Sequence, residues 1–173
     1  MKIVHLLLLT LCFVVPSTAN ADAAAQCQAN KGAYLTGAVT SGPVFARGHL
    51  QGGVELSHTH VMLRADQDSR LYDVAIDNVF ASGYDAAGEA VPVPLSTIAV
   101  GNRLELCGRL YTQGGPGIDW VHNNCGNTPT AAQPDGWLRV ISQAGTPGPN
   151  LESSQEYCRL WPQKSRRGYP RPI

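Results

Sequence analysis

The sequence contains no apolar run long enough to cross a membrane as a helix. Its longest run, residues 3–15, falls short of the roughly 18 apolar residues that a spanning helix needs. Lys2 precedes this run, and Ala19-Asn20-Ala21 follows it with small residues, an order typical of a secretory signal peptide. We therefore expect residues 1–21 to be cleaved off, and a soluble mature chain exported to the periplasm or the extracellular space.

Several motifs of enzymes and metal sites are also missing. There is no Cys-x-x-Cys pair of the kind that cysteine-based zinc sites use. No Gly-x-Ser-x-Gly elbow surrounds Ser57, and the glycine-rich segment 114–117 fits a hairpin turn rather than a phosphate-binding loop. These absences favour a protein that is not an enzyme, although they leave the question open.

Charged residues are few and unevenly spread. Residues 22–156 carry seven Lys or Arg against thirteen Asp or Glu, whereas residues 157–173 carry five basic residues and no acidic one. The acidic body argues against general nucleic-acid binding, because Lys and Arg contacts to phosphate supply most of that affinity. We expect residues 143–173 to form an irregular, basic, Pro/Gly-rich tail resting on the acidic body. An anionic partner for this tail is the alternative.

Four cysteines remain after the predicted cleavage. An even number in an oxidising compartment indicates disulfide bonds, and four cysteines allow three pairings. We favour Cys107–Cys125, because these residues flank a predicted hairpin, and Cys27–Cys158, which would join the two ends of the domain.

The sequence of the mature chain predicts short strands separated by turns. Apolar and polar residues alternate with a period of two in the best candidates, whereas Pro92 and Pro94 forbid a long helix within residues 80–98. The predicted strands are residues 33–40, 54–64, 70–79, 104–111, 118–122 and 137–141. This order predicts an all-β fold, a small closed or partly open barrel of the oligonucleotide/oligosaccharide-binding (OB) type, with a β-sandwich as the alternative. The domains are then a signal peptide (1–21), a lead-in (22–32), the barrel (33–142) and the tail (143–173).

Five short segments occur in an order that resembles a known family. They are Leu56 to Leu63, Ile76 to Val79, Val100 to Tyr111, Asp119 to His122 and Asp135 to Trp137. Over residues 36–141 the chain resembles the small exported bacterial proteins of the domain-of-unknown-function family numbered 3465. It departs from that pattern at Ala75 and Asp119, where histidines are expected. The resemblance implies an OB-like barrel without an established activity.

Histidines are the first candidates for a functional site. His58 and His60 form a His-x-His pair on a strand, so both side chains project from one face about 7 Å apart. With His122 or Asp119 from the return strand they would hold a divalent metal that activates water, and Asp77 is a further candidate. The alternative is a half-solvated sheet face without any cofactor.

Tryptophans beside carboxylates are the second candidates. Asp119 precedes Trp120, and Asp135 lies two residues before Trp137. Exposed indole rings would stack on sugars or bases, and the carboxylates would accept hydrogen bonds from hydroxyl groups. Burial in the barrel core is the alternative for both rings, and we expect Trp161 to be a packing residue.

These observations favour an exported binding or interaction module whose ligand and partners the sequence does not identify. A metal-dependent hydrolase built on His58, His60 and His122, acting on phosphodiesters or glycans, is the alternative. A structural envelope protein with incidental histidines is the third possibility.

Overall fold

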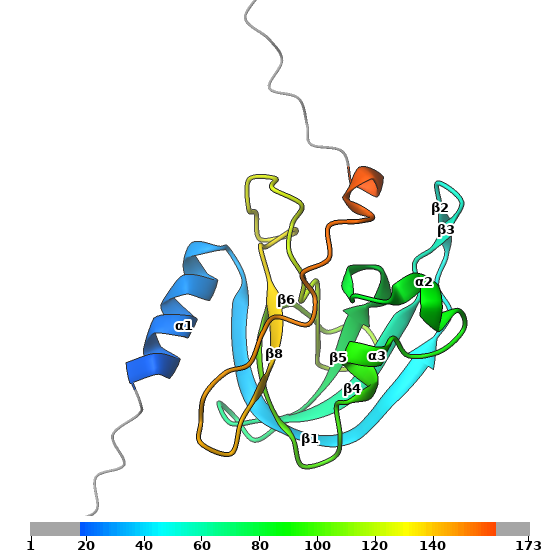
Figure 1. The fold of residues 1–173 in the computed structure, drawn as a ribbon. Coiled ribbons are helices and arrows are strands. Elements are labelled where there is room, and N and C mark those ends of the chain that lie inside the picture. Colours follow the sequence, from blue (N-terminus) through cyan, green and yellow to red (C-terminus); the bar gives the residue numbers. More distant parts are fainter. Residues whose placement is uncertain (1–17, 162–173) are drawn as a thin grey trace, which may run out of the picture.

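Six strands form one continuous sheet, and five of them close into a barrel in the computed structural model, which describes residues 18–161 (Figure 1). The strands are β1 (Ala33–Ala46), β4 (His58–Ala65), β5 (Leu71–Asp77), β6 (Arg103–Tyr111), β7 (Gly117–Asp119) and β8 (Trp137–Ile141). The order is β1-β4-β5-β7-β6-β8, and β1 also pairs with β6 to close the ring. All pairs are antiparallel except β5 with β7. The predicted small all-β barrel is thus confirmed.

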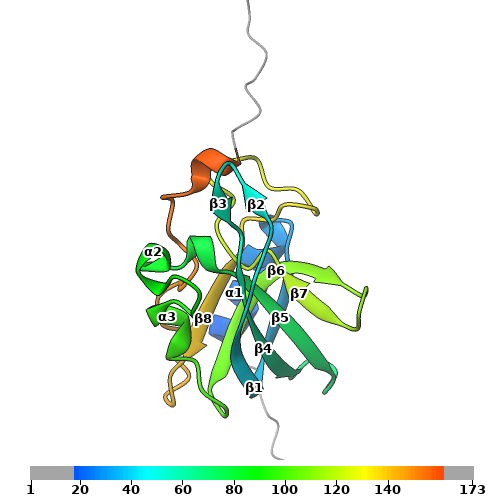
Figure 2. The ribbon, with the colours of Figure 1, turned by 90° about the vertical axis from the view of Figure 1, so that its right-hand side faces the viewer.

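The remaining elements lie around the barrel. They are the helix α1 (Thr18–Ala29), the hairpin β2 (Leu50–Gln51) with β3 (Val54–Glu55), and the short turns η1 (Asn78–Phe80), α2 (Tyr84–Ala87), α3 (Val93–Ser96) and η2 (Cys158–Leu160). The α1 helix lies outside the barrel (Figure 1), and the β2–β3 hairpin rises beside η2 at one end (Figure 2). Among the described residues no helix is long and apolar enough to cross a membrane.

Strand β1 is longer than predicted, and its bend closes the barrel. It pairs with β6 through Ala33–Ala38 and with β4 from Gly37 to Ala46, with register shifts after Val39 and after Ser41. The Ser41-Gly42-Pro43 segment, which suggests a turn in the sequence, is therefore a bulged part of one bent strand. Close approach to β4 requires glycine at position 37, where a Cβ atom would lie 2.2 Å from the Arg64 carbonyl oxygen.

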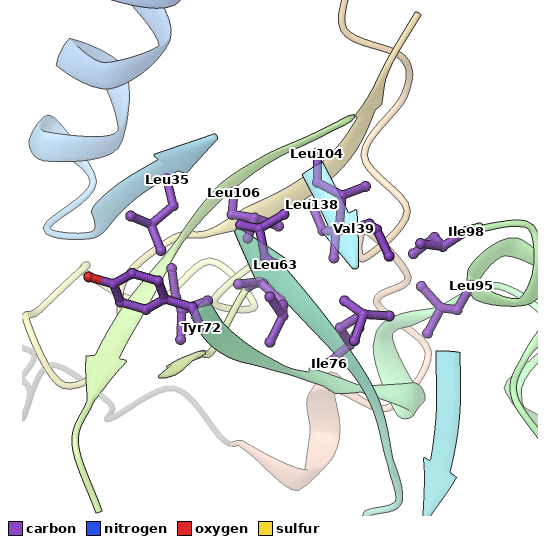
Figure 3. Close-up of a cluster of buried hydrophobic side chains, with 14 of the residues drawn as sticks. Leu35, Val39, Leu63, Tyr72, Ile76, Leu95, Ile98, Leu104, Leu106 and Leu138 are labelled. Carbon is purple, nitrogen blue, oxygen red and sulfur yellow. The ribbon is translucent and has the colours of Figure 1, made fainter. Parts of the chain in front are cut away.

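The inward-facing residues of all six strands fill the barrel interior (Figure 3). In β4 and β5 every second residue is buried, as the period-two pattern predicts. Leu95 and Ile98, from the connection between β5 and β6, lie on the opposite side of this cluster from Tyr72. Leu104 and Leu106 of β6 are fully buried, whereas Leu110 of the same strand is 48% exposed because it lies where β6 runs into the β6–β7 hairpin.

The disulfide bonds are Cys27–Cys107 and Cys125–Cys158, so the favoured pairing is wrong. Strand β7 ends at Asp119, and the chain then leaves the hairpin, which carries Cys125 away from Cys107. Cys107 instead pairs in register with Tyr34 and Trp137, on the side of the barrel that α1 covers. The first bond thus fastens α1 to β6, and the second fastens the C-terminal segment to the loop after β7.

Residues 143–161 are irregular apart from η2, and they pack on the barrel. Glu152 and Tyr157 are buried, and the backbone N–H groups of Leu151 and Ser154 donate to carbonyls of Leu138 and Phe80. A second apolar cluster joins this segment to the body, through Leu56, Val79, Phe80 and Tyr157 with Leu160 and Trp161 against them. The sequence did not predict this packing, because the segment has no periodic pattern of apolar residues.

Two expectations fall mainly outside the described residues. Most of the predicted signal peptide lies in residues 1–17, and the predicted cleavage point after Ala21 falls within α1. Most of the basic residues of the tail lie in residues 162–173. The signal peptide and the anionic partner stay predictions.

Replacing Leu106 by Ala tests the core. Its side chain is fully buried, so Leu106→Ala should lower the free energy of unfolding by about 2–5 kcal/mol, measured by urea denaturation. Leu110→Ala, on the same strand but half-exposed, is the matched control and should change it by less than about 0.5 kcal/mol. Equal losses for the two variants would contradict the burial pattern of β6.

Graded reduction tests the disulfide arrangement. Cys27 and Cys107 are fully buried, whereas Cys125 and Cys158 are partly exposed, so a thiol reductant should open Cys125–Cys158 first. Alkylation of the native protein followed by peptide mass spectrometry measures the order. A linked peptide containing Cys107 and Cys125, or earlier reduction of Cys27–Cys107, would contradict the structure.

Candidate functional site

An open pocket of about 230 Å³ lies where the β2–β3 hairpin approaches the C-terminal segment. Strands β4 to β7 contribute His58, Ala75, Asp77, Arg109 and Asp119 to its wall. The β2–β3 hairpin and its flanks contribute His49, Gln51 and Leu56, the loop after β7 contributes Trp120, and the C-terminal segment contributes Trp161. The hairpin is held in place there, because Gln51 Nε2 donates to the Leu160 carbonyl oxygen at 2.7 Å. The pocket is therefore lined by the ends of these strands and by three other stretches of the chain.

Two cross-strand pairs place opposite charges on the pocket wall. His58 is the register partner of Asp77 across β4 and β5, with 3.0 Å between Nε2 and Oδ1. Arg109 is the register partner of Asp119 across β6 and β7. Its Nε and Nη2 atoms donate to the two carboxylate oxygens at 2.9 and 2.6 Å, a bidentate geometry that fixes both side chains.

Asp77 also lies close to a second histidine. Its Oδ2 atom is 3.3 Å from His122 Nε2. Burial alone would raise the pKa of Asp77, but the contacts with His122 and His58 outweigh it and hold this pKa well below its usual value. The hydrogen bond to Asp77 in turn raises the pKa of His58, against the opposing effect of burial. Asp77 is thus an ionised carboxylate between two imidazoles.

His122 belongs to the interior and not to the pocket wall. It is 1% exposed and stacks on Phe80, with ring centroids 3.7 Å apart. Its Nδ1 atom lies 2.6 Å from the Asn123 carbonyl oxygen, which can only accept, so Nδ1 carries a proton. Both ring nitrogens therefore face protein groups.

The structure does not bring His58, His60 and His122 together around one point in the described part of the chain. His58 and His60 do project from one face, with ring centroids 6.2 Å apart, but His60 Nδ1 lies 2.9 Å from Asp73 and not toward Asp77. Within residues 18–161 no three His, Cys, Asp or Glu side chains are placed to hold one metal ion. The cause is local, because a carboxylate on the neighbouring strand engages each histidine of the pair.

Trp120 lies at the pocket, as its neighbour Asp119 does. Its backbone adopts φ +54°, a left-handed conformation that is rare for a bulky side chain and occurs preferentially at functional sites. Its indole Nε1 atom is buried without a hydrogen-bond partner in the described part of the chain. The Arg109 guanidinium carbon lies 5.8 Å from the centroid of its ring, within cation–π range.

Trp137 and Asp135 do not contribute to this site. Trp137 is 3% exposed, and its Nε1 atom donates to Glu105 beside the Cys27–Cys107 bond, so the core alternative is confirmed for this ring. Asp135 Oδ1 accepts the backbone N–H of Asn124, which gives it a role in the loop. Trp161 packs on Phe80, with ring centroids 5.0 Å apart, as expected of a packing residue. It also lines the pocket.

Arg109 and Glu152 were missed in the sequence. A signal for Arg109 was present, because a hairpin turn centred on residues 112–116 places it opposite Asp119. Glu152 had no such signal. It is fully buried, and neither of its carboxylate oxygens has a hydrogen-bond partner among residues 18–161. Burial, and to a lesser degree the charge of Asp77, raises the pKa of Glu152 well above its usual value, which favours the neutral acid.

The buried Glu152 predicts a specific dependence of stability on pH. With a raised folded-state pKa, wild-type stability is greatest below the unfolded-state pKa and falls as the pH rises above it. Glu152→Gln removes this ionisation, so its melting temperature relative to wild type should increase between pH 4 and pH 8. Thermal denaturation followed by circular dichroism measures this difference. The exposed Glu156→Gln is the control, and a difference for Glu152→Gln that stays constant with pH would contradict the assignment.

The chain matches no protein-family model and no curated protein. Membership of the family that it resembles therefore stays a prediction, and the function has to be inferred from the site.

Proposed function

We propose that the protein is a binding module and that its ligand site is the pocket at the end of strands β4 to β7. The observation that carries this proposal is the composition of that pocket. Two indole rings, Trp120 and Trp161, meet a small set of fixed polar groups in one concavity. Ligand sites have this general form, with apolar and aromatic walls and few polar groups that set the orientation.

The position of the pocket in the barrel supports the same function. OB barrels bind ligands on the face of their second and third strands and with the adjoining loops. Here β4 and β5 are the second and third strands of the barrel, and the β2–β3 hairpin belongs to the first connection. The fold alone implies no function, so the residues in this position carry the argument.

The hydrolase alternative has less support. It needs several imidazole nitrogens around one point, whereas His60 binds Asp73 and the other two histidines share Asp77. The third alternative, a structural protein, does not explain why Trp120 adopts a positive φ beside a pocket.

We also propose that the module works outside the cytoplasm. Two disulfide bonds are typical of an oxidising compartment such as the periplasm or the extracellular space. The predicted signal peptide agrees with this location.

Binding can be tested by titrating the isotope-labelled protein with methyl glycosides, nucleosides and free amino acids. We expect one of these classes to shift the backbone amide resonances of the pocket residues. Trp120→Ala should then weaken the affinity by about 10-fold, since a stacked aromatic ring contributes on the order of 1–3 kcal/mol.

Val100→Ala is the control for this measurement, because Val100 is 65% exposed and lies outside the pocket. Its affinity should equal that of the wild type, and near-ultraviolet circular dichroism checks that both variants are folded. The proposal is wrong if no class shifts the pocket amides, or if folded Trp120→Ala binds as the wild type does.

A further inference from the structure

Among the ionisable groups of the pocket wall, nearly every formal charge is matched by a partner within the protein. Arg109 is bound through two hydrogen bonds to Asp119, and Asp77 lies between His58 and His122. The exposed His49 is the exception. A charged ligand would have to displace one of these partners or lose its own hydration without gaining a counter-charge, and both are costly. The pairing therefore selects against ions of either sign.

The same groups keep hydrogen-bonding capacity for uncharged ligands. A carboxylate offers about four lone-pair sites, and the pairings described above use only part of those on Asp119. His58 has a second ring nitrogen besides the Nε2 atom that contacts Asp77. Hydroxyl groups both donate and accept, so they are suited to such a mixed set of partners.

The indole rings add a condition on the shape of the ligand. The face of an aromatic ring carries partial negative charge and attracts the slightly positive C–H groups of an apolar ligand face. A pyranose ring offers such a face on one side and hydroxyl groups around its edge. Nucleotides also stack on aromatic rings, but their phosphate needs a cation, and the guanidinium of Arg109 is already occupied by Asp119.

The size of the pocket limits the ligand further. A volume of about 230 Å³ lies below the roughly 300–1,000 Å³ typical of sites for drug-sized molecules. One sugar ring is compatible with this volume, and the open mouth leaves room for a chain to continue.

We infer that the pocket binds a single uncharged pyranose unit, stacked on tryptophan and held through its hydroxyl groups by the paired side chains. This inference rests on the proposed binding function and assigns the class of ligand. The expected ligand is a neutral sugar, and sugar acids, amino sugars and nucleotides are excluded.

A charge series on one ring scaffold tests the inference. The methyl pyranosides of glucose, galactose and mannose are compared with the corresponding uronates and 2-amino sugars, and with adenosine and its monophosphate, by amide chemical shifts of the pocket. We expect a neutral pyranoside to bind at least 10-fold more tightly than its charged analogues and than both adenosine compounds.

The outcomes separate this inference from the binding function itself. If a charged sugar, adenosine or its phosphate binds as tightly or more tightly at the pocket, the ligand class is wrong and the binding function stands. If none of these compounds shifts the pocket amides, the neutral-sugar inference is overturned, and the wider titration described above decides the binding function.

Breaking one charge pair tests the reason for the preference. Asp119→Asn leaves the Arg109 guanidinium without its counter-charge, so the affinity for the uronate should rise at least 10-fold relative to the affinity for the neutral sugar. Arg109→Met leaves Asp119 unpaired, so the affinity for the amino sugar should rise instead. Arg103→Met is the matched control, because Arg103 also lies on β6 and pairs with an aspartate, Asp66, but lies outside this pocket.

The control should keep the wild-type order of affinities. An unchanged order in folded Asp119→Asn and Arg109→Met would overturn the charge-pairing argument. Should one of the two variants fail to fold, the other variant and the wild-type series still decide the outcome.

Discussion

The pairing of β1 with both β4 and β6 is the constraint on which the rest of the structure depends. One strand has to serve both edges of the sheet, so it is long, bulged and close to its neighbour at Gly37. Once the ring is closed, the registers of the other strands are fixed by which residues face inward. Those registers set His58 opposite Asp77 and Arg109 opposite Asp119, so the charge pairs of the pocket follow from barrel closure.

Most charged side chains at this end of the barrel are neutralised by a neighbour of opposite charge. Each ionised carboxylate of the pocket wall lies against a guanidinium or an imidazole. Glu152 differs, since it lies in the interior with no partner among the described residues, and its carboxyl group is stabilised in the neutral form. Burial acts on both Asp77 and Glu152, but only Asp77 has histidines close enough to reverse the effect on its pKa.

The C-terminal segment completes the pocket. Cys158 is bonded to Cys125, and the following residues place Leu160 against the hairpin and Trp161 against Phe80 and the pocket. The second disulfide therefore connects the loop after β7, which carries Trp120 at its start, with the segment that carries Trp161. One wall of the pocket depends on this covalent link, whereas the first disulfide stabilises α1 on the other side of the barrel.

The sequence by itself determined most of β4 and β5, where every second residue is buried with the period of two that a strand requires, and the position of β8. It also determined that His58 and His60 share a face and that Asp119 and Trp120 are site candidates. The disulfide pairing, the burial of Trp137, the partners of the histidines and the place of residues 143–161 were settled only by the tertiary structure. Those features are contacts between segments far apart in the chain, and barrel closure, not local pattern, selects which segments meet.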